Sequence, residues 1–493
     1  MSARLIDTKY DGLTTFSTWL FGVGHVMNDL CAAVWFNYLL YYLADVQRVD
    51  SATAGAVMLA GQLADGISTP LVGLYSDRFV TKIGKRKPWY IFGTILVPIC
   101  FFWVFEECFP CTNLSGAADL AVSMIWYCAW AAFFNVGWAA IQISHLALIP
   151  QLSPLKETKD KLIGIRTGFT YIANIAVLLI ALLLFKTISR PVLQFTVLTL
   201  IVLIGGGIIN VMFILFINEV ELSRIAGASY LQLGSLLSQN GARNQEEQAT
   251  KSEDVQTIEV EDSPAMEEKK MTWRDWLKDT QIYPVGLCYM MARLANNVST
   301  AMMPFYLTAV LGMGGVHTIE QASKKTPWEL ALIPLCMYIG SVSMSFYIKA
   351  ITNYVSRKIQ FFIGTVCVVI GSIPMLFLEH SEQYVMVPLS IVLGIGFTFE
   401  LNNSQSFIAA FVGAQGTTGA FVWGIISLFD KFSSGIALFL LTNLGSLDDK
   451  EYIRITVTGL PLVASIAGTL ILFFIKPQQE FSKVDADKNK ELE

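Results

Sequence analysis

Twelve long apolar runs dominate this sequence of 493 residues and limit the folds that it can adopt. They lie at about 13–43, 53–75, 89–105, 119–149, 164–186, 194–217, 281–311, 329–350, 359–378, 384–412, 420–443 and 454–476. Most of them are long enough to cross the ~30 Å hydrocarbon core of a bilayer as a helix. A helix also satisfies its own backbone polar groups, which lipid cannot do. The runs therefore predict an all-α integral membrane protein with twelve transmembrane helices.

A polar stretch at 218–280 divides the runs into two sets of six. This symmetry predicts two six-helix bundles, at 1–217 and 281–476, related by a pseudo-two-fold axis and followed by a tail at 477–493. The central stretch is rich in Glu, Gln, Asp and Ser, and we expect part of it to be disordered. Tyr230 and Leu233 fit the Tyr-x-x-apolar pattern that sorting adaptors bind, although an amphipathic helix on the membrane surface explains them equally well.

The short loops between the runs differ in their content of Lys and Arg. On one side lie Arg78, Lys82, Lys85, Arg86, Lys87, Lys156, Lys159, Lys161, Arg357 and Lys358; on the other lie Arg48, Lys186, Arg190, Lys324, Lys325, Lys450 and Arg454. The excess on the first side predicts that both termini and the central loop are cytosolic. On the opposite side, Asn113 begins a glycosylation sequon. Cys108 and Cys111, in the same loop, would form a local disulfide in an oxidising compartment or remain two free thiols.

Polar and ionisable side chains lie inside several of the runs, where a charge costs on the order of 2.5–3.5 kcal/mol on insertion scales. The first set of runs contains His25, Asn28, Asp29, Gln62, Asp65, Thr69, Gln142, His145 and Arg166; the second contains Arg293, Asn296, Asn297, Glu400, Asp430 and Lys431. Those within one run share a helical face by their spacing. They are therefore candidates for a functional site.

Carboxylates in the first half and cations in the second suit a zwitterionic substrate, because each charge of the substrate would find a partner. They also suit a relay for protons or sodium. Glu400 and the neighbours Asp430 and Lys431 have an alternative interpretation, as static pairs that hold helices together. The alternative for His145 is a packing residue without a role in proton transfer. The sequence contains no nucleotide-binding loop, nucleophile triad or metal cluster, so we expect neither enzyme activity nor a cofactor.

The loop at 73–88 has the pattern Gly-x-x-x-Asp-Arg followed by Gly-Lys-Arg-Lys-Pro. Its marked residues are Gly73, Asp77, Arg78, Gly84, Lys85 and Arg86. This pattern resembles the loop between the second and third helices of the major facilitator superfamily. The resemblance implies the major facilitator fold and transport by alternating access, with these residues stabilising one state of a gate.

Two further stretches resemble the glycoside–pentoside–hexuronide:cation symporters of that superfamily: Phe21-Gly-Val-Gly-His25-Val-Met-Asn28-Asp29 and Ala64-Asp65-Gly-Ile-Ser-Thr69-Pro70. The resemblance implies that Asp29 takes the place of a sugar-binding Asp. Asp65 takes the place of the first Asp of a cation-binding pair, whose second position is Thr69. Another Asp of the family is replaced by Gln142, whereas its Arg and Lys correspond to Arg166 and Lys431. The loss of two carboxylates argues against sodium coupling and sugar binding, because a hard cation prefers several charged oxygen ligands.

A narrower resemblance rests on Gly137-Trp138, Gln142-Ile-Ser-His145-Leu and Ile149-Pro150. These residues are similar to an animal branch of the superfamily that moves cysteine into lysosomes and melanosomes and thereby affects pigmentation. The resemblance implies a multi-pass transporter of cysteine, or of a similar zwitterion, in the lysosomal or melanosomal membrane. One alternative is a cation-coupled symporter for a sugar or lipid at the plasma membrane. Another is a non-transporting sensor or scaffold that acts through the 218–280 loop.

Overall fold

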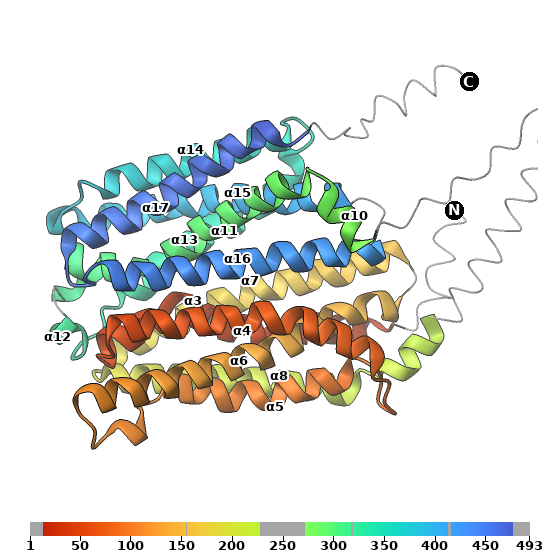
Figure 1. Cartoon of the computed structure of the whole chain (residues 1–493), viewed down its shortest axis with the longest axis horizontal. Helices are drawn as coiled ribbons and strands as arrows, with labels where there is room; N and C mark the ends of the chain where they lie inside the picture. Colours follow the sequence, from red (N-terminus) through yellow and green to blue (C-terminus); the bar gives the residue numbers. More distant parts are fainter. Residues whose placement is uncertain (1–12, 154, 227–271, 317–318, 413–415, 477–493) are drawn as a thin grey trace, which may run out of the picture.

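The computed structural model describes residues 13–153, 155–226, 272–316, 319–412 and 416–476. Within these ranges the chain is almost entirely helical, and its long helices lie side by side along one axis (Figure 1). Tyr230, Leu233 and most of the predicted central loop lie outside the described residues.

The first bundle contains the helices drawn in red to yellow in Figure 1. They are α2 (Thr15–Val23), α3 (Val26–Tyr41) with the π-helical turn η1 (Tyr42–Val46), α4 (Ser51–Arg78), α5 (Lys87–Val104), α6 (Gly116–Leu152), α7 (Lys156–Thr187) and α8 (Pro191–Phe216). Helix α6 packs against both α4 and α5, and α3 packs against α7 and α8. The helices α2 and α3 together occupy the place of the first predicted span.

The second bundle contains the helices drawn in green to blue. They are α10 (Trp273–Lys278), α11 (Ile282–Phe305) with the π-helical turn η3 (Tyr306–Val310), α12 (Ile319–Ala322), α13 (Glu329–Ile351), α14 (Arg357–Met375), α15 (Met386–Val412), α16 (Gly416–Leu444) and α17 (Lys450–Ile471). Helix α15 packs against α13 and α14, and α11 packs against α17.

The two bundles repeat the same internal contacts. The Tyr42 hydroxyl, at the start of η1, donates to the carbonyl of Phe105 over 2.7 Å. In the second bundle the Tyr306 hydroxyl, at the start of η3, donates to the carbonyl of Met375 over 2.6 Å. Each bond joins the first helix of a bundle to the end of its third. This internal equivalence and the packing order are those of the predicted major facilitator fold.

Ten of the described helices are long and apolar enough to cross a membrane on that basis alone. The first and seventh predicted spans do not reach this criterion, for two different reasons. A break at Gly24–His25 divides the first span into α2 and α3. The seventh span, α11, is continuous but carries Arg293, Asn296 and Asn297, which lower its apolarity. Both still pack inside their bundles as spans do.

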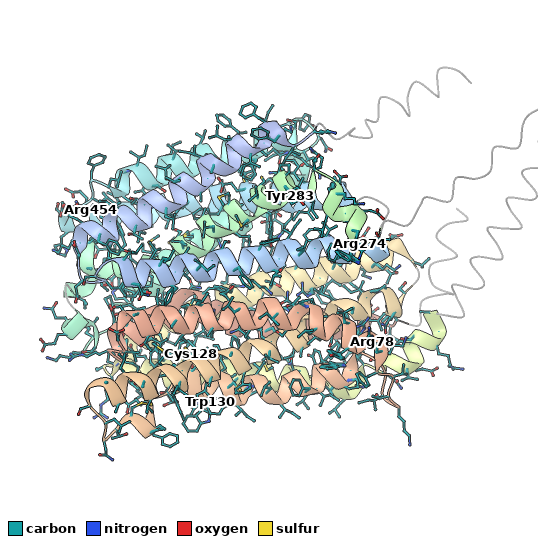
Figure 2. The ribbon with its side chains drawn as sticks, viewed as in Figure 1. Arg78, Cys128, Trp130, Arg274, Tyr283 and Arg454 are labelled. Carbon is teal, nitrogen blue, oxygen red and sulfur yellow. A yellow bond between two sulfur atoms is a disulfide. The ribbon has the colours of Figure 1, made fainter. Side chains whose placement is uncertain are left out.

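The two ends of the molecule differ, and we name them by the loops that they carry. The basic-loop end holds residues 79–86, directly after Arg78, and Arg274 lies at the same end of the molecule (Figure 2). The disulfide end holds Cys108 and Cys111, and Arg454 lies at this end (Figure 2).

The bundles meet closely at the disulfide end. The guanidinium of Arg48 donates to the Ser323 hydroxyl over 2.5 Å, and Lys186 Nζ lies 4.2 Å from the ring centre of Trp328. A Cβ atom on Gly55 of α4 would lie 1.8 Å from the Thr442 hydroxyl of α16. Only glycine therefore permits this approach.

Candidate functional site

A break in the first span creates the polar centre of the first bundle. Helix α2 ends just before Gly24, and α3 begins just after His25. A helix end leaves backbone carbonyls without intrahelical partners. Side chains from other helices reach two carbonyls here: His145 Nε2 lies 2.8 Å from the Phe21 oxygen, and the Tyr90 hydroxyl donates to the Gly24 oxygen over 2.6 Å. Discontinuous helices of this kind form binding sites in many secondary transporters.

Asp29 lies one turn into α3, directly after the break. His25 Nδ1 is 3.0 Å from one carboxyl oxygen of Asp29, and the Thr170 hydroxyl donates to the other over 3.0 Å. Arg166, one turn before Thr170 on α7, interacts electrostatically with Asp29. Among the described residues, His25 Nε2 and Arg166 Nε are buried without a hydrogen-bond partner. The cluster thus contains one hydrogen-bond acceptor, the Asp29 carboxylate, and two nitrogen atoms, His25 Nε2 and Arg166 Nε, that are available to a ligand.

Trp138 of α6 borders this cluster. Its indole N–H donates to the backbone oxygen of Asn28 over 3.2 Å, and the Asn28 side chain donates to the Trp138 oxygen over 2.8 Å. The ammonium of Lys431 lies 5.9 Å from the centre of the Trp138 ring, at the outer limit of a cation–π contact. Trp138 therefore lies between the first-bundle cluster and a cation from the second bundle.

Asp65 and Lys431 form an ion pair between the bundles. Lys431 Nζ on α16 is 2.5 Å from Asp65 Oδ2 on α4. The Thr69 hydroxyl donates to Asp65 Oδ1 over 3.1 Å and lies 3.3 Å from Lys431 Nζ. Gly66, next to Asp65, lies at this contact between the helices: a Cβ there would lie 2.8 Å from Leu428 Cδ1, so a larger residue would displace the Leu428 side chain.

Asp430, the neighbour of Lys431, points to a different partner. Arg293 Nε on α11 lies 3.1 Å from Asp430 Oδ2, and Asn297 Nδ2 donates to the Ser434 hydroxyl over 3.0 Å. Both contacts join α11 to α16 within the second bundle. Asp430 thus contacts its own bundle, whereas the adjacent Lys431 contacts the opposite one.

Four of the sequence-predicted site residues join none of these contacts. Gln62 is buried at the contact between α4 and α16, and Asn296 is partly exposed on α11. The Gln142 Oε1 atom is buried without a partner among the described residues. Glu400 is fully buried inside the second bundle and contacts α14 and α17.

The basic loop is held by a residue that the sequence analysis did not select. Glu219, in a short helical segment after α8, accepts the backbone N–H groups of Lys85, Arg86 and Lys87 over 2.7, 3.0 and 2.8 Å. Helix α5 begins here, so its free N–H groups and its dipole favour a carboxylate. The sequence did contain a signal for Glu219: it is an acidic residue just after the apolar run at 194–217.

Gly84 makes this arrangement possible. Its φ of 120° lies in a region that side chains disfavour, and a Cβ would lie 2.1 Å from Glu219 Oε2. The Arg86 guanidinium donates to the Ser76 hydroxyl near the end of α4. Arg78 is exposed, and the side chain of Asp77 lies outside the described part.

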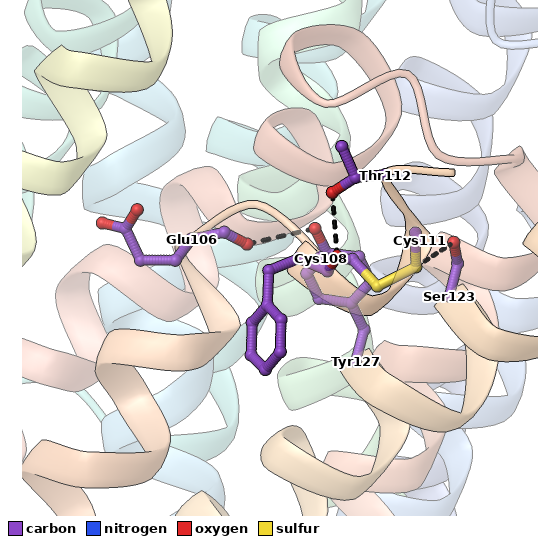
Figure 3. Close-up of a disulfide and its surroundings, with 7 residues drawn as sticks. Glu106, Cys108, Cys111, Thr112, Ser123 and Tyr127 are labelled. Atoms are coloured by element: carbon purple, nitrogen blue, oxygen red, sulfur yellow. Dashed lines mark hydrogen bonds between the residues drawn. A yellow bond between two sulfur atoms is a disulfide. The ribbon is translucent and has the colours of Figure 1, made fainter. Parts of the chain in front are cut away.

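A disulfide and a hydrogen bond fix the loop at the disulfide end. Cys108 and Cys111 form a disulfide across the turn η2 (Phe109–Cys111) (Figure 3). The Tyr127 hydroxyl donates to the Glu106 oxygen over 3.1 Å, which fixes the loop to α6. Asn113 follows this turn and is exposed, as a glycan acceptor has to be.

Comparison with known proteins agrees with this architecture. Residues 20–239 match the family model described as MFS/sugar transport protein. The Escherichia coli xylose transporter XylE, in its inward open conformation, superimposes with a TM-score of 0.63 at 10% identity, over 94% of this chain and 97% of that one. Together with a human relative that is 33% identical over 86% of this chain, these likenesses show a membrane transporter of the major facilitator superfamily rather than an enzyme.

Two curated relatives define its place within the superfamily. Major facilitator superfamily domain-containing protein 12 of Homo sapiens is 33% identical over 86% of this chain and 84% of that protein. An uncharacterized symporter of Synechocystis is 21% identical over 94% of this chain and 90% of that protein. The chain belongs to the family of major facilitator superfamily domain-containing protein 12.

Proposed function

We propose that this transporter moves cysteine, or a zwitterion like it, from the cytosol into the lumen of lysosomes or melanosomes. The observation that carries the proposal is the position of Asp29 at the break in the first span, within electrostatic reach of Arg166. A free amino acid presents one ammonium and one carboxylate. The Asp29 carboxylate accepts hydrogen bonds from the first, and the forked Arg166 guanidinium donates to the second.

The remaining site residues have supporting roles in this proposal. His25 and Asn28 orient the Asp29 region, and His25 passes or holds a proton through its unpartnered Nε2. Arg293 offers a second cation for a substrate carboxylate. The bundles rock about the bound substrate and expose it to each side in turn, as in other transporters built from repeats. The Gly73–Arg86 loop stabilises one of the two states.

The Lys431–Asp65 pair favours transport without sodium. In this structure the ammonium of Lys431 supplies the positive charge that a bound sodium ion would bring to Asp65. Thr69 adds only a hydroxyl, which is a weaker ligand for a hard cation than a carboxylate.

The loops support an orientation with the basic-loop end in the cytosol. A dense set of Lys and Arg in short loops marks the cytosolic side. The disulfide and the exposed Asn113 at the opposite end suit an oxidising, glycosylating lumen.

Uptake of radiolabelled cysteine into isolated lysosomes tests the proposal. Asp29→Asn keeps the shape of the side chain and removes its charge, so uptake should fall at least tenfold at unchanged protein level. Asp119→Asn, the same change in the first turn of α6, should leave uptake intact. Wild-type uptake by the Asp29→Asn protein would contradict the assignment.

A second candidate function is cation-coupled symport of a sugar or lipid. The description of the matching family model as a sugar transport protein and the symporter relative favour it. Uptake measured with sodium replaced by potassium separates the two candidates: cysteine uptake should not change, whereas sodium-dependent sugar uptake would support the second candidate.

A further inference from the structure

Glu400 is a buried carboxyl group that the site between the bundles does not use. It lies on α15, and its side chain is fully enclosed. The Thr365 hydroxyl of α14 lies 2.8 Å from Oε1, and the Ser465 hydroxyl of α17 lies 3.0 Å from Oε2. Side chains of two other helices of the second bundle, α14 and α17, therefore hold the group.

Small residues close this region tightly. A Cβ on Gly364 of α14 would lie 2.8 Å from the Gly396 oxygen of α15 and 3.1 Å from Glu400 Cγ. The two helices therefore touch through their backbones next to the carboxyl group. Such packing limits the access of water to Glu400.

The hydrogen-bond partners of Glu400 carry no positive charge. Among the side chains that the structure describes, no Lys, Arg or His nitrogen lies within 4 Å of its carboxyl oxygens. The titratable groups that face it are the thiols of Cys288 on α11 and Cys367 on α14, which are themselves acids. Hydroxyl groups supply its hydrogen bonds, and they carry no charge. An ionised carboxylate without a paired cation is very costly in such surroundings.

The hydrogen-bond geometry around Thr365 accommodates an additional proton. Its Oγ1 atom lies 2.8 Å from Glu400 Oε1, 2.8 Å from the Thr469 hydroxyl and 3.3 Å from the Ser465 backbone oxygen. A hydroxyl has one proton to donate and two lone pairs to accept with. If Glu400 is protonated, Thr365 accepts from Glu400 and Thr469 and donates to Ser465, so each of the three contacts contains one proton. If Glu400 is ionised, Thr365 donates to it, and the contact with the Ser465 oxygen has no proton.

We propose that Glu400 is a proton-binding site inside the second bundle, occupied as a neutral carboxylic acid that donates to Thr365. The site is separate from the charges between the bundles. The inference concerns the state of the protein itself and does not depend on which substrate is carried.

Infrared difference spectroscopy of the purified full-length protein tests this inference. A protonated buried carboxyl gives a C=O stretch that is resolved from ionised carboxylates, and isotope exchange in deuterium oxide shifts it. We expect this band at neutral pH in potassium buffer and its loss in Glu400→Gln. Ser404→Ala, one turn along α15 and bonded to the backbone oxygen of Leu401, should retain the band.

A second variant covers the case in which Glu400→Gln does not fold. Thr365→Val removes the acceptor of the acid proton but keeps the side-chain shape, so the band should move to higher frequency. A band that persists in Glu400→Gln, or does not move in Thr365→Val, would overturn the proposal. Loss of the band on replacing potassium by sodium would overturn it in favour of a sodium ion among the same oxygens.

Discussion

Lys431 Nζ lies 2.5 Å from Asp65 Oδ2, and this ion pair joins the second bundle to the first. Both groups are almost entirely buried, so each charge depends on the other for compensation. Asp430, the preceding residue on α16, is instead paired with Arg293 of its own bundle. The eleventh span therefore carries one contact that persists within a bundle and one that has to break when the bundles separate.

Removal of one partner of the inter-bundle pair should destabilise the protein more than removal of both. Lys431→Met leaves the Asp65 carboxylate buried without a cation, a defect worth about 3–5 kcal/mol. The double variant Asp65→Asn with Lys431→Met should recover most of that loss. Thermal unfolding of the four proteins in a double-mutant cycle measures the coupling. Lys324→Ala, which breaks an exposed pair with Glu320, should have little effect on stability, because water and salt screen such a pair. Additive effects of the two buried substitutions would refute the predicted coupling.

Glu219→Ala should release the basic loop, because the N–H groups of Lys85, Arg86 and Lys87 lose their common acceptor. Hydrogen exchange read by mass spectrometry should become faster in residues 84–88 by at least tenfold. Glu221→Ala serves as the control, since that carboxylate binds only the exposed Arg224 among its described partners. Unchanged exchange in the Glu219 variant would show that the loop is held by other contacts.

Gly55→Leu should prevent closure of the disulfide end, since even a Cβ at this position meets the Thr442 hydroxyl at 1.8 Å. Spin labels on the exposed residues Ser115 and Lys450 should then report a longer mean distance, and transport should be lost. Gly207→Leu places the same side chain on α8, where no atom lies within 4 Å of the added Cβ, and should have little effect. An unaltered label distance in the Gly55 variant would exclude a steric role for this glycine.

The orientation of the protein can be tested at Asn113. If the disulfide end faces the lumen, Asn113→Gln should abolish a glycan that glycosidase removes from the wild-type protein, and the two treatments should give the same mobility on a gel. Asn402→Gln, at a sequon inside α15, should not change the mobility. A wild-type protein that glycosidase does not shift would leave the proposed orientation without this support.

The spans and the fold class were predictable because transmembrane helices are long and apolar. The spacing of His25, Asn28 and Asp29 also predicted that they lie close together, although His25 precedes the first residue of α3. The break at Gly24–His25 was not predicted, since it depends on contacts with His145 and Tyr90, which are distant in sequence. Periodicity alone favours a continuous helix there.

Side-chain partners were harder to predict than helices. The sequence shows that Asp430 and Lys431 are neighbours, but adjacent positions on a helix point in directions about 100° apart, so their partners differ. The sequence also does not show whether Glu400 faces the other bundle or the interior of its own. Glu219 was missed because its partners are backbone N–H groups, which every sequence contains.

The equivalent bonds of Tyr42 and Tyr306 have a mechanical consequence. Each bond fastens the first and third helices of a bundle at the disulfide end, which leaves those helices little freedom to slide past one another there. A displacement imposed at that end is then passed along each bundle as rotation of a rigid body rather than absorbed by local shear. The break at Gly24–His25 has no counterpart in the continuous α11, so this bond constrains an interrupted first helix in one bundle and an unbroken one in the other.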